Sequence, residues 1–376
     1  MNWHIVTGEY PPQPGGVSDY TRVLAKGLVA AGDTVDVWAP ESDGVEAADN
    51  GIILHRLPSR FGPGALRRLD RGLASNGVAN LLIQYVPQAF GWKGMNLLFC
   101  AWLYARRRWA PIVMFHEVMY PSELDTPLRY RLLSAVSVVM ASIVARASAR
   151  IFVSSPIWQE ILRTRVRMNK PTEWLPLPST IPVIQDDERI AEKRRRYQYE
   201  DGLIIGHFSS YPEATRRLLR QIVPAILQAN PTISLTLIGA ASAKCREELI
   251  AADASLATRI HASGELPLDE ISLRLSACDL MLQLYPDGCC ARRTTLIAAL
   301  AHGRAVVTTS GPATEPLWQR AAALALVEDA EQSTIINVVN ELVAKPELRQ
   351  KLGRSAARLY SERFELSNSI RMLRET

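Results

Sequence analysis

The sequence predicts an α/β protein of two domains, each a parallel sheet with helices on both faces. Apolar runs of strand length alternate with helical patterns in both halves of the chain. A proline-rich and then highly charged stretch, residues 171–201, separates the halves, and 376 residues are too many for one ordinary core. We expect a first domain over residues 1–180, a linker over 181–200, a second domain over 201–362, and a C-terminal helix over 363–376 that is able to cross back to the first domain.

The composition is ordinary for a soluble globular protein, with 48% hydrophobic and 22% charged residues. The five cysteines form no C-x-x-C pair, which argues against a disulfide framework or a zinc site and favours a reducing compartment. The first residues lack the charged segment of a signal peptide, so we expect a cytoplasmic protein. The net charge is only +5, and the basic clusters are scattered without a recognised nucleic-acid motif. We therefore expect no nucleic-acid partner.

Two apolar stretches bear on membrane contact. Residues 132–145 are broken by serines and too short to span a bilayer, which favours a core helix. A run that begins near Met95 ends in three arginines and a tryptophan, residues 106–109, and this pattern suits an anionic membrane surface. A buried helix with a basic last turn explains the same pattern. Both interpretations stay open, and the membrane role that we consider is a peripheral contact at the inner membrane face.

The first half opens with a strand over residues 3–7 and a turn-rich loop with two adjacent glycines, Gly15 and Gly16. Ser18 is placed to cap the helix that follows. Strand, glycine loop and helix are the opening of a Rossmann-like unit, although this loop is not the G-x-G-x-x-G dinucleotide fingerprint. The glycines allow a ligand to approach the backbone closely, or serve only the turn. Further strands are expected at residues 35–39, 52–57, 81–85, 112–116 and 151–154.

Polar residues follow several of these strands at the edge where open parallel sheets bind ligands. They are Gln84 with Tyr85, His116 with Glu117, and Ser154 with Ser155. His116 is suited to donate a hydrogen bond to a reacting sugar or phosphate oxygen. A purely structural histidine is the alternative.

The second half repeats the alternation, and its most informative stretch is residues 285–303. A strand end is followed by a loop and then by a helix that Arg292, Arg293, Thr294 and Thr295 open and Gly303 stops. Arginines at a helix N-terminus make an anion site, whereas a solvated loop face is the alternative. The strands expected around it are residues 203–208, 233–239, 259–262, 279–284, 305–309 and 324–327.

The order and spacing of several short motifs give the chain a family resemblance. They are residues 10–16 (YPPQPGG), 177–182, 235–239, 261–264, 277–279, and 300–309 with Glu315. The chain resembles a GT-B-fold glycosyltransferase of the large family four type (glycosyl transferases group 1), whose members transfer sugar from a nucleotide donor. The resemblance implies two Rossmann-like, doubly wound domains that face a central cleft, with the acceptor on the side of the first domain.

The resemblance also implies roles for residues of this chain. Gly15 and Gly16 would lie under the donor diphosphate, and His116 would lie by the transferred sugar. The nucleotide-binding residues would be Ser209, Gly264, Glu265 and Glu315.

The chain departs from the family where two glutamates normally stand eight positions apart. Cys290 and Ala298 occupy those positions. We expect Arg292, Arg293, Thr294 and Thr295 to bind the diphosphate instead, and Asp287 to contact sugar hydroxyls.

We expect transfer of a hexose-like sugar without a metal or other cofactor. Fixed arginines and helix N–H groups can stabilise the departing diphosphate, and an Asp-x-Asp motif is absent from the sequence. Retention of anomeric configuration is implied by the resemblance alone. The acceptor stays open between a lipid-linked molecule, a polysaccharide and a small molecule. The alternatives are a nucleotide-sugar-binding protein without turnover and a GT-B nucleotide-sugar epimerase.

Overall fold

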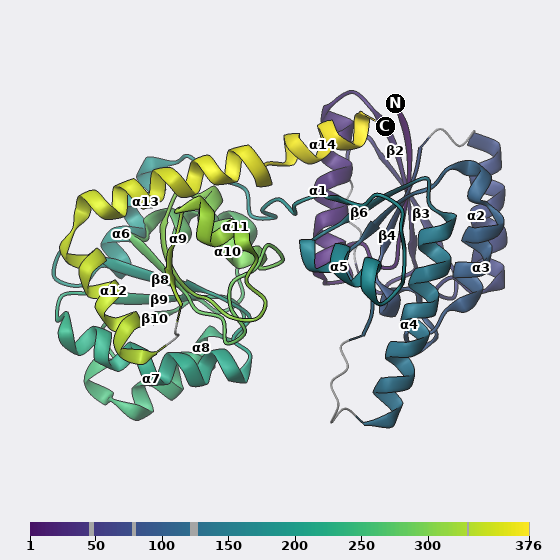
Figure 1. Ribbon diagram of the computed structural model, residues 1–376. Coiled ribbons are helices and arrows are strands. Elements are labelled where there is room, and N and C mark those ends of the chain that lie inside the picture. The colour runs from purple at the N-terminus through teal and green to yellow at the C-terminus, as the bar shows by residue number, and fades with distance from the viewer. Residues whose placement is uncertain (45–48, 77–79, 121–126, 329–330, 376) are drawn as a thin grey trace. The chain divides into compact units, whose positions relative to one another are not determined.

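The computed structural model describes residues 1–44, 49–76, 80–120, 127–328 and 331–375. The chain forms two compact units (Figure 1): unit 1 is Met1–Leu177 with Leu366–Thr376, and unit 2 is Pro178–Glu365. Each described unit contains a parallel sheet flanked by helices, which confirms the predicted α/β fold class.

Unit 1 is built on a seven-stranded parallel sheet with the order β3-β2-β1-β4-β5-β6-β7. The strands are β1 (Asn2–Thr7), β2 (Thr34–Pro40), β3 (Ile52–Leu57), β4 (Asn80–Tyr85), β5 (Ile112–Phe115), β6 (Arg150–Val153) and β7 (Glu173–Trp174). The helices are α1 (Gly16–Ala30), α2 (Pro63–Asn76), α3 (Leu97–Ala105), α4 (Leu128–Ala147), α5 (Pro156–Thr164) and α14 (Leu366–Arg374), with short 3₁₀ turns η1 (Pro87–Phe90), η2 (Trp92–Gly94) and η3 (Arg107–Trp109).

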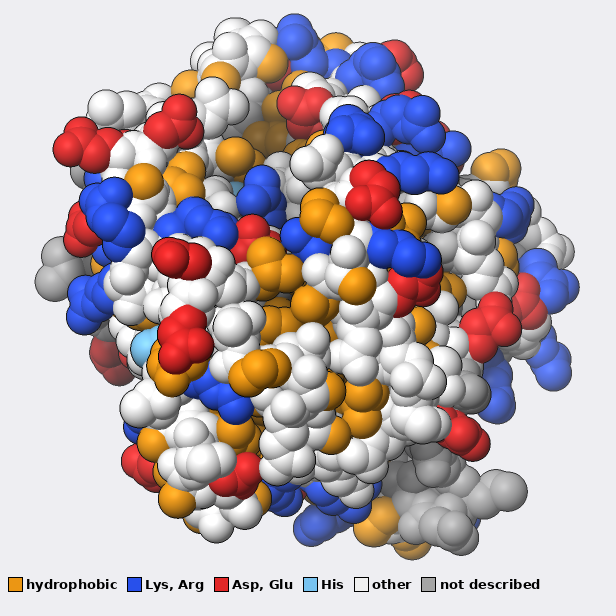
Figure 2. Space-filling model, turned by 90° about the vertical axis from the view of Figure 1, so that its left-hand side faces the viewer, with side chains coloured by type: hydrophobic (Ala, Val, Ile, Leu, Met, Phe, Trp, Pro, Cys, Tyr) orange, Lys and Arg blue, Asp and Glu red, His pale blue; other side chains and the backbone are white. Residues whose placement is uncertain are grey.

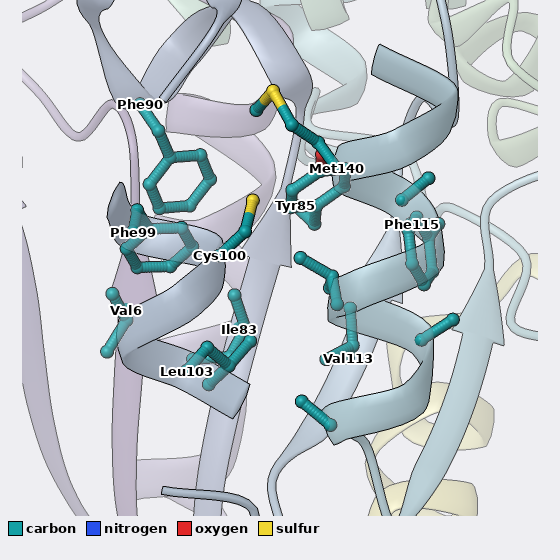
Figure 3. Close-up of a cluster of buried hydrophobic side chains, with 14 of the residues drawn as sticks. Val6, Ile83, Tyr85, Phe90, Phe99, Cys100, Leu103, Val113, Phe115 and Met140 are labelled. Atoms are coloured by element: carbon teal, nitrogen blue, oxygen red, sulfur yellow. The ribbon is translucent and has the colours of Figure 1, made fainter. Parts of the chain in front are cut away.

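Both faces of this sheet are buried, because parallel strands carry apolar side chains on both sides. Helices α1 and α14 cover one face, and α2, α3, α4 and α5 cover the other. Figure 3 shows the second face, where Phe99 of α3 and Met140 of α4 point towards Ile83 and Tyr85 of β4. The sheet therefore presents its loops, and not its faces, to ligands.

Unit 2 is built on a six-stranded parallel sheet with the order β10-β9-β8-β11-β12-β13. The strands are β8 (Ile204–Phe208), β9 (Ser234–Ile238), β10 (Ile260–Ala262), β11 (Leu280–Gln283), β12 (Ala305–Thr309) and β13 (Ala325–Val327). The helices are α6 (Asp187–Tyr197), α7 (Glu213–Ala229), α8 (Ser242–Ala252), α9 (Leu268–Ala277), α10 (Thr294–Ala301), α11 (Pro316–Ala321), α12 (Gln332–Ala344) and α13 (Pro346–Leu359), with short helical turns η4 (Ala254–Leu256) and η5 (Tyr360–Phe364).

Residues 181–200 do not form the linker that the charged composition suggested. Most of them make up α6, which packs against α9 inside unit 2. The guanidinium of Arg194 lies 3.0 Å from the Asp279 carboxylate, and Ile184 N donates to Ser272 Oγ at 3.0 Å. The charges are the solvated face of a docked helix, so unit 2 begins at Pro178.

The C-terminal helix α14 belongs to unit 1, although it follows unit 2 in the chain. It lies beside α1 near both chain ends (Figure 1). Arg150 Nη1 donates to the Met372 carbonyl at 3.1 Å, and Leu373 is fully buried.

Helix α4 is longer than the apolar run in the sequence suggested. Its 20 residues make it, within the described part of the chain, the one helix long and apolar enough to cross a membrane by length and composition; a third of its most apolar window is buried. The expectation of a run too short to span was wrong because the helix continues through the serines, and the Ser137 hydroxyl is satisfied by the Ser134 carbonyl at 2.7 Å. One side of α4, with Met140 and Val144, does belong to the core of unit 1.

Candidate functional site

The strand order of unit 2 reverses direction between β8 and β11. In open parallel sheets this switch point opens a crevice at the carboxyl ends of the two strands, where ligands bind. The loop after β11 begins at Leu284, and the loop after β8 begins at Ser209. The stretch 285–303 therefore starts at the place where unit 2 is topologically suited to hold a ligand.

The loop after β11 is held firmly against β12. Tyr285 N donates to Thr309 Oγ1 at 2.9 Å, and Cys289 N donates to the Thr309 carbonyl at 2.8 Å. Gly288 has a φ of 93°, and a Cβ there would lie 2.4 Å from Gly311 N. Only glycine fits this conformation and this close approach, so the loop backbone is preorganised.

Four side chains gather where this loop enters α10. The Arg293 guanidinium pairs with the Asp287 carboxylate and lies over the Tyr285 ring, 4.9 Å from its centroid. The Tyr285 hydroxyl in turn lies 2.8 Å from Thr295 Oγ1. Burial raises the pKa of Tyr285, which keeps this hydroxyl protonated.

Helix α10 begins at Thr294 and not at Arg292, because Arg293 already has non-helical backbone angles as the N-cap residue. The first N–H groups of a helix have no carbonyl partner within it, so those of Thr294 and Thr295 are placed for an anion. Arg292 is exposed in the preceding turn. Gly303, with a φ of 60°, ends the helix as predicted.

The altered glutamate positions are filled by buried side chains. Cys290 is 3% exposed and Ala298 is fully buried, so neither presents a polar group. Glu315 is also buried and turned inward: its carboxylate accepts hydrogen bonds from Ala291 N at 3.0 Å and Trp318 Nε1 at 2.7 Å. In this structure Glu315 positions the loop that carries the arginines.

The other nucleotide-binding candidates lie in the loops after β8 and β10. Gly239 N donates to Ser263 Oγ at 3.0 Å, and Gly264 N donates to Ser242 Oγ at 2.9 Å, which ties the loops after β9 and β10 together. A Cβ on Gly264 would meet no atom within 4 Å, so its backbone is open to a ligand.

Glu265 is exposed beside Gly264, whereas Ser209 is engaged locally and accepts from Tyr211 N at 3.0 Å. Arg216, in the helix that follows, is paired with Glu248 and does not supply a free cation to this loop.

In unit 1 the strand order reverses between β1 and β4. The glycine loop follows β1, but a carboxylate already occupies the N-terminus of α1. Val17 N and Ser18 N both donate to Glu9 Oε1 at 3.1 Å, and a Cβ on Gly15 would lie 2.4 Å from this oxygen.

Helix α1 starts at Gly16, so Ser18 does not cap it as expected; its hydroxyl donates instead to the Gln13 carbonyl at 2.7 Å. Glu9 takes the place of the cap, and burial raises its pKa. A diphosphate at Gly15 and Gly16 would therefore compete with Glu9. A Cβ on Gly16 meets no atom within 4 Å, so the approach to the loop itself is open.

His116 lies directly after β5 and is buried. Its Nε2 is 2.6 Å from Gln84 Oε1, and its ring meets that of Tyr20 edge-on at 5.1 Å. Burial lowers the pKa of His116 to about 3, so the imidazole is neutral at physiological pH. Because Gln84 Oε1 can only accept, Nε2 carries the proton and Nδ1 is left as an acceptor. The structure therefore differs from the expectation that His116 donates to a sugar or phosphate oxygen, since its N–H is used on Gln84.

Among the described residues no group of three or more His, Cys, Asp or Glu side chains is placed to hold a metal ion. Two residues that the structure brings into the sites, Glu9 and Tyr285, were not predicted as site residues from the sequence. A carboxylate between a strand end and a glycine loop was the available signal for Glu9. Nothing in the pattern indicated that the Tyr285 ring would lie under Arg293.

Two parallel α/β units with polar loops at their switch points define a protein of the GT-B class. Residues 14–176 match Glycosyltransferase Family 4, and residues 201–345 match Glycosyl transferases group 1. Together these matches span most of the chain, which belongs to the GT-B glycosyltransferases of the family four type.

Solved structures share the fold over nearly their whole length. Sucrose-phosphate synthase from Thermosynechococcus elongatus is 17% identical, with a TM-score of 0.71 over 100% of this chain and 98% of that one. HepE from Anabaena, solved with UDP and glucose, is 16% identical with a TM-score of 0.67 over 99% and 98%. WaaG, a glycosyltransferase involved in lipopolysaccharide biosynthesis, is 15% identical with a TM-score of 0.66 over 98% of both chains. The search of curated proteins finds no matching sequence.

Proposed function

We propose that this glycosyltransferase takes its sugar from a nucleoside diphosphate sugar that binds at the switch point of unit 2. The observation that carries the proposal is the cluster of Arg293, Asp287 and Tyr285 at the N-terminus of α10. A helix N-terminus and a guanidinium suit diphosphate oxygens. The Anabaena relative, solved with UDP and glucose, supports a donor of this class.

The proposed reaction needs no metal. The leaving diphosphate gains negative charge in the transition state, and Arg292, Arg293 and the first N–H groups of α10 are fixed charges and dipoles that can stabilise it. Retention of configuration and transfer of a hexose are proposed from the family alone.

A thermal-shift panel and an acceptor-dependent assay test this function. Uridine, guanosine or adenosine diphosphate, or one of their sugars, should raise the melting temperature in the presence of EDTA, because a ligand that binds only the folded state stabilises it. Release of free nucleoside diphosphate should then depend on an added acceptor. Donor binding without release by any acceptor class would favour a binding protein, and a changed sugar without acceptor would favour an epimerase.

We also propose that the acceptor is lipid-linked and that unit 1 meets it at an anionic membrane. The relevant surface, here called the outer helical layer, consists of the solvent sides of α2, α3, η3 and α4, which lie on one face of the sheet (Figure 1). These elements, with Arg106 between α3 and η3, carry one acidic residue, Asp70. The same elements carry nine arginines: Arg67, Arg68, Arg71, Arg106, Arg107, Arg108, Arg129, Arg131 and Arg146.

The outer helical layer also exposes apolar stripes. On α4, Leu128 and Leu132 are 79% and 59% exposed, and Ala135 and Val139 continue the same helical side. This side lies opposite the buried side that holds Ser137. On α3, residues 97, 101 and 104 form a shorter exposed stripe. Single exposed apolar residues are common, but contiguous stripes flanked by arginines suit a membrane interface.

Vesicle flotation tests this contact. The protein should float with vesicles that contain anionic phospholipid and not with neutral ones. Replacing Arg129 and Arg131 by glutamine should weaken binding by roughly 30-fold, since each cation near an anionic surface contributes about 1 kcal/mol.

Leu132→Glu should also reduce flotation. Val183→Glu, which likewise places a glutamate at an exposed apolar position but in unit 2, should not. Equal flotation of the two glutamate variants would contradict a role for the outer helical layer.

A further inference from the structure

Unit 2 contains a second polar cavity, away from its switch point, at the sheet edge formed by β10. The cavity has a volume of about 500 Å³ and lies among α6, α8, α9 and β10. Its lining includes Arg196, Tyr197, Arg246, His261, Ser263 and Arg274. Strand β9 separates β10 from β8 in the sheet, so this cavity is distinct from the crevice between β8 and β11.

Arg274 is the most informative residue of this cavity. Its side chain is 8% exposed, and its Nε and Nη1 atoms have no hydrogen-bond partner among the described residues. The guanidinium lies over the Tyr197 ring, 4.5 Å from the centroid, which leaves Nε and Nη1 without a hydrogen bond. A buried cation without an anion is unfavourable, because lost hydration is not replaced.

The groups around Arg274 add positive charge. Arg246 lines the same cavity and is anchored through Nε to the Ile260 carbonyl at 2.7 Å. Burial lowers the pKa of His261, and the nearby Arg246, Arg274 and Arg196 lower it further. The cavity therefore gathers the positive charges of three arginines.

Nearby carboxylates do not neutralise this charge. Glu270, one helical turn before Arg274, is already paired with Lys193 at 2.9 Å and with Arg189 at 3.0 Å. Glu247 also lines the cavity, but it is exposed. Figure 2 views the side of unit 2 that carries α6 and α12 and shows groups of Lys and Arg side chains, with Asp and Glu side chains among them. An external anion is the partner that the buried guanidinium lacks.

We propose that this cavity is a second anion site, which binds a phosphate group carried by a small molecule. The unused donors of Arg274 would meet two oxygens of the phosphate in the forked geometry that guanidinium groups favour. Arg196 is exposed at the rim and would close over the bound anion. The site uses none of the residues assigned to the donor diphosphate.

Inorganic phosphate is the probe that tests the site, with thermal shift and calorimetry as readouts. To remove the donor loop as a competing anion site, the measurement is repeated in an Arg292→Gln, Arg293→Gln background. Phosphate should raise the melting temperature in both proteins relative to chloride at the same ionic strength. Arg274→Gln should weaken phosphate binding by about 10- to 150-fold, the loss expected for a hydrogen bond to a charged group.

A matched pair of exposed arginines on α6 provides the control and does not depend on the folding of Arg274→Gln. Arg196→Gln should weaken phosphate binding, whereas Arg195→Gln, whose side chain does not line the cavity, should leave it unchanged. Equal binding by these two variants, or no binding in the Arg292→Gln, Arg293→Gln background, would overturn the proposal. In the unmodified protein, a response to inorganic phosphate without any response to nucleoside diphosphates or their sugars would contradict the proposed function and leave the phosphate site standing.

Discussion

Replacing Arg293 by alanine is expected to weaken binding of the nucleoside diphosphate by about 10- to 150-fold, because a hydrogen bond to a charged group contributes roughly 1.5–3 kcal/mol. The substitution also leaves the Asp287 carboxylate without its partner at the N-terminus of α10. That unpaired negative charge would repel the diphosphate. Arg292→Ala should therefore have a smaller effect than Arg293→Ala, since the Arg292 side chain is exposed in the turn before the helix. Isothermal titration with the diphosphate measures both.

A substitution at Asp287 separates the hydrogen bond that Arg293 donates to the diphosphate from the repulsion that an unpaired Asp287 carboxylate causes. Arg293 and Asp287 form a partly exposed pair, and such pairs contribute about 0.2–1 kcal/mol. Asp287→Asn should therefore strengthen binding of the free diphosphate a few-fold, while it weakens turnover of the sugar donor if Asp287 contacts sugar hydroxyls. In the Asp287→Asn background, the cost of Arg293→Ala should fall. Unchanged diphosphate affinity in Arg292→Ala and Arg293→Ala would remove both residues from the donor site.

The fold was predictable because its periodicity is strong. Short apolar strands alternate with helices throughout, and most strands differ from the expected positions by at most a residue or two at their ends. Strand β7 was not predicted, because its two residues lie in the stretch that was interpreted as the domain boundary. The prediction of a linker was wrong because a charged composition indicates only that side chains are exposed. Helix α6 exposes most of its charged side chains, but Lys193 and Tyr197 are buried. Composition could not distinguish a solvated helix face from a disconnected segment. Membership of α14 in unit 1 depends on tertiary packing that no local pattern encodes.

The candidate sites were predictable only in part. A helix N-terminus behind a strand end is a local pattern, so the loop before α10 could be found from sequence. The partners of its side chains could not, because Asp287 and Tyr285 reach Arg293 through the turn that Gly288 makes. At α1 the expected capping residue was displaced by Glu9, which competes with Ser18 from seven residues upstream of the helix start. Competition of this kind depends on the loop path and not on spacing.

Replacing His116 by alanine is expected to lower kcat by about 5- to 150-fold, because loss of a buried hydrogen-bonding partner that leaves the other group unsatisfied costs roughly 1–3 kcal/mol, with little change in donor affinity. His116 belongs to unit 1, whereas the proposed diphosphate site belongs to unit 2. In this structure Nε2 donates to Gln84, so Nδ1 is the atom left to accept a hydrogen bond from a sugar hydroxyl. His116→Asn, which keeps a polar atom near the position of Nδ1, should retain more activity than His116→Ala. Steady-state kinetics and titration with the donor measure the two effects separately.

The pH dependence of stability and of kcat tests whether His116 is neutral in the folded protein. Burial lowers the pKa of His116 to about 3, below the ordinary histidine value of about 6.5. At pH values between about 3 and 6.5, His116 therefore binds a proton in the unfolded chain and not in the folded protein. The contribution of His116 to the free energy of unfolding falls as the pH drops below about 6.5. Above that pH the contribution is constant, and kcat should show no inflection that His116→Asn removes. An inflection near pH 6.5 that disappears in this variant would mean that His116 ionises during turnover, and equal kcat in His116→Ala and the unmodified enzyme would exclude it from catalysis.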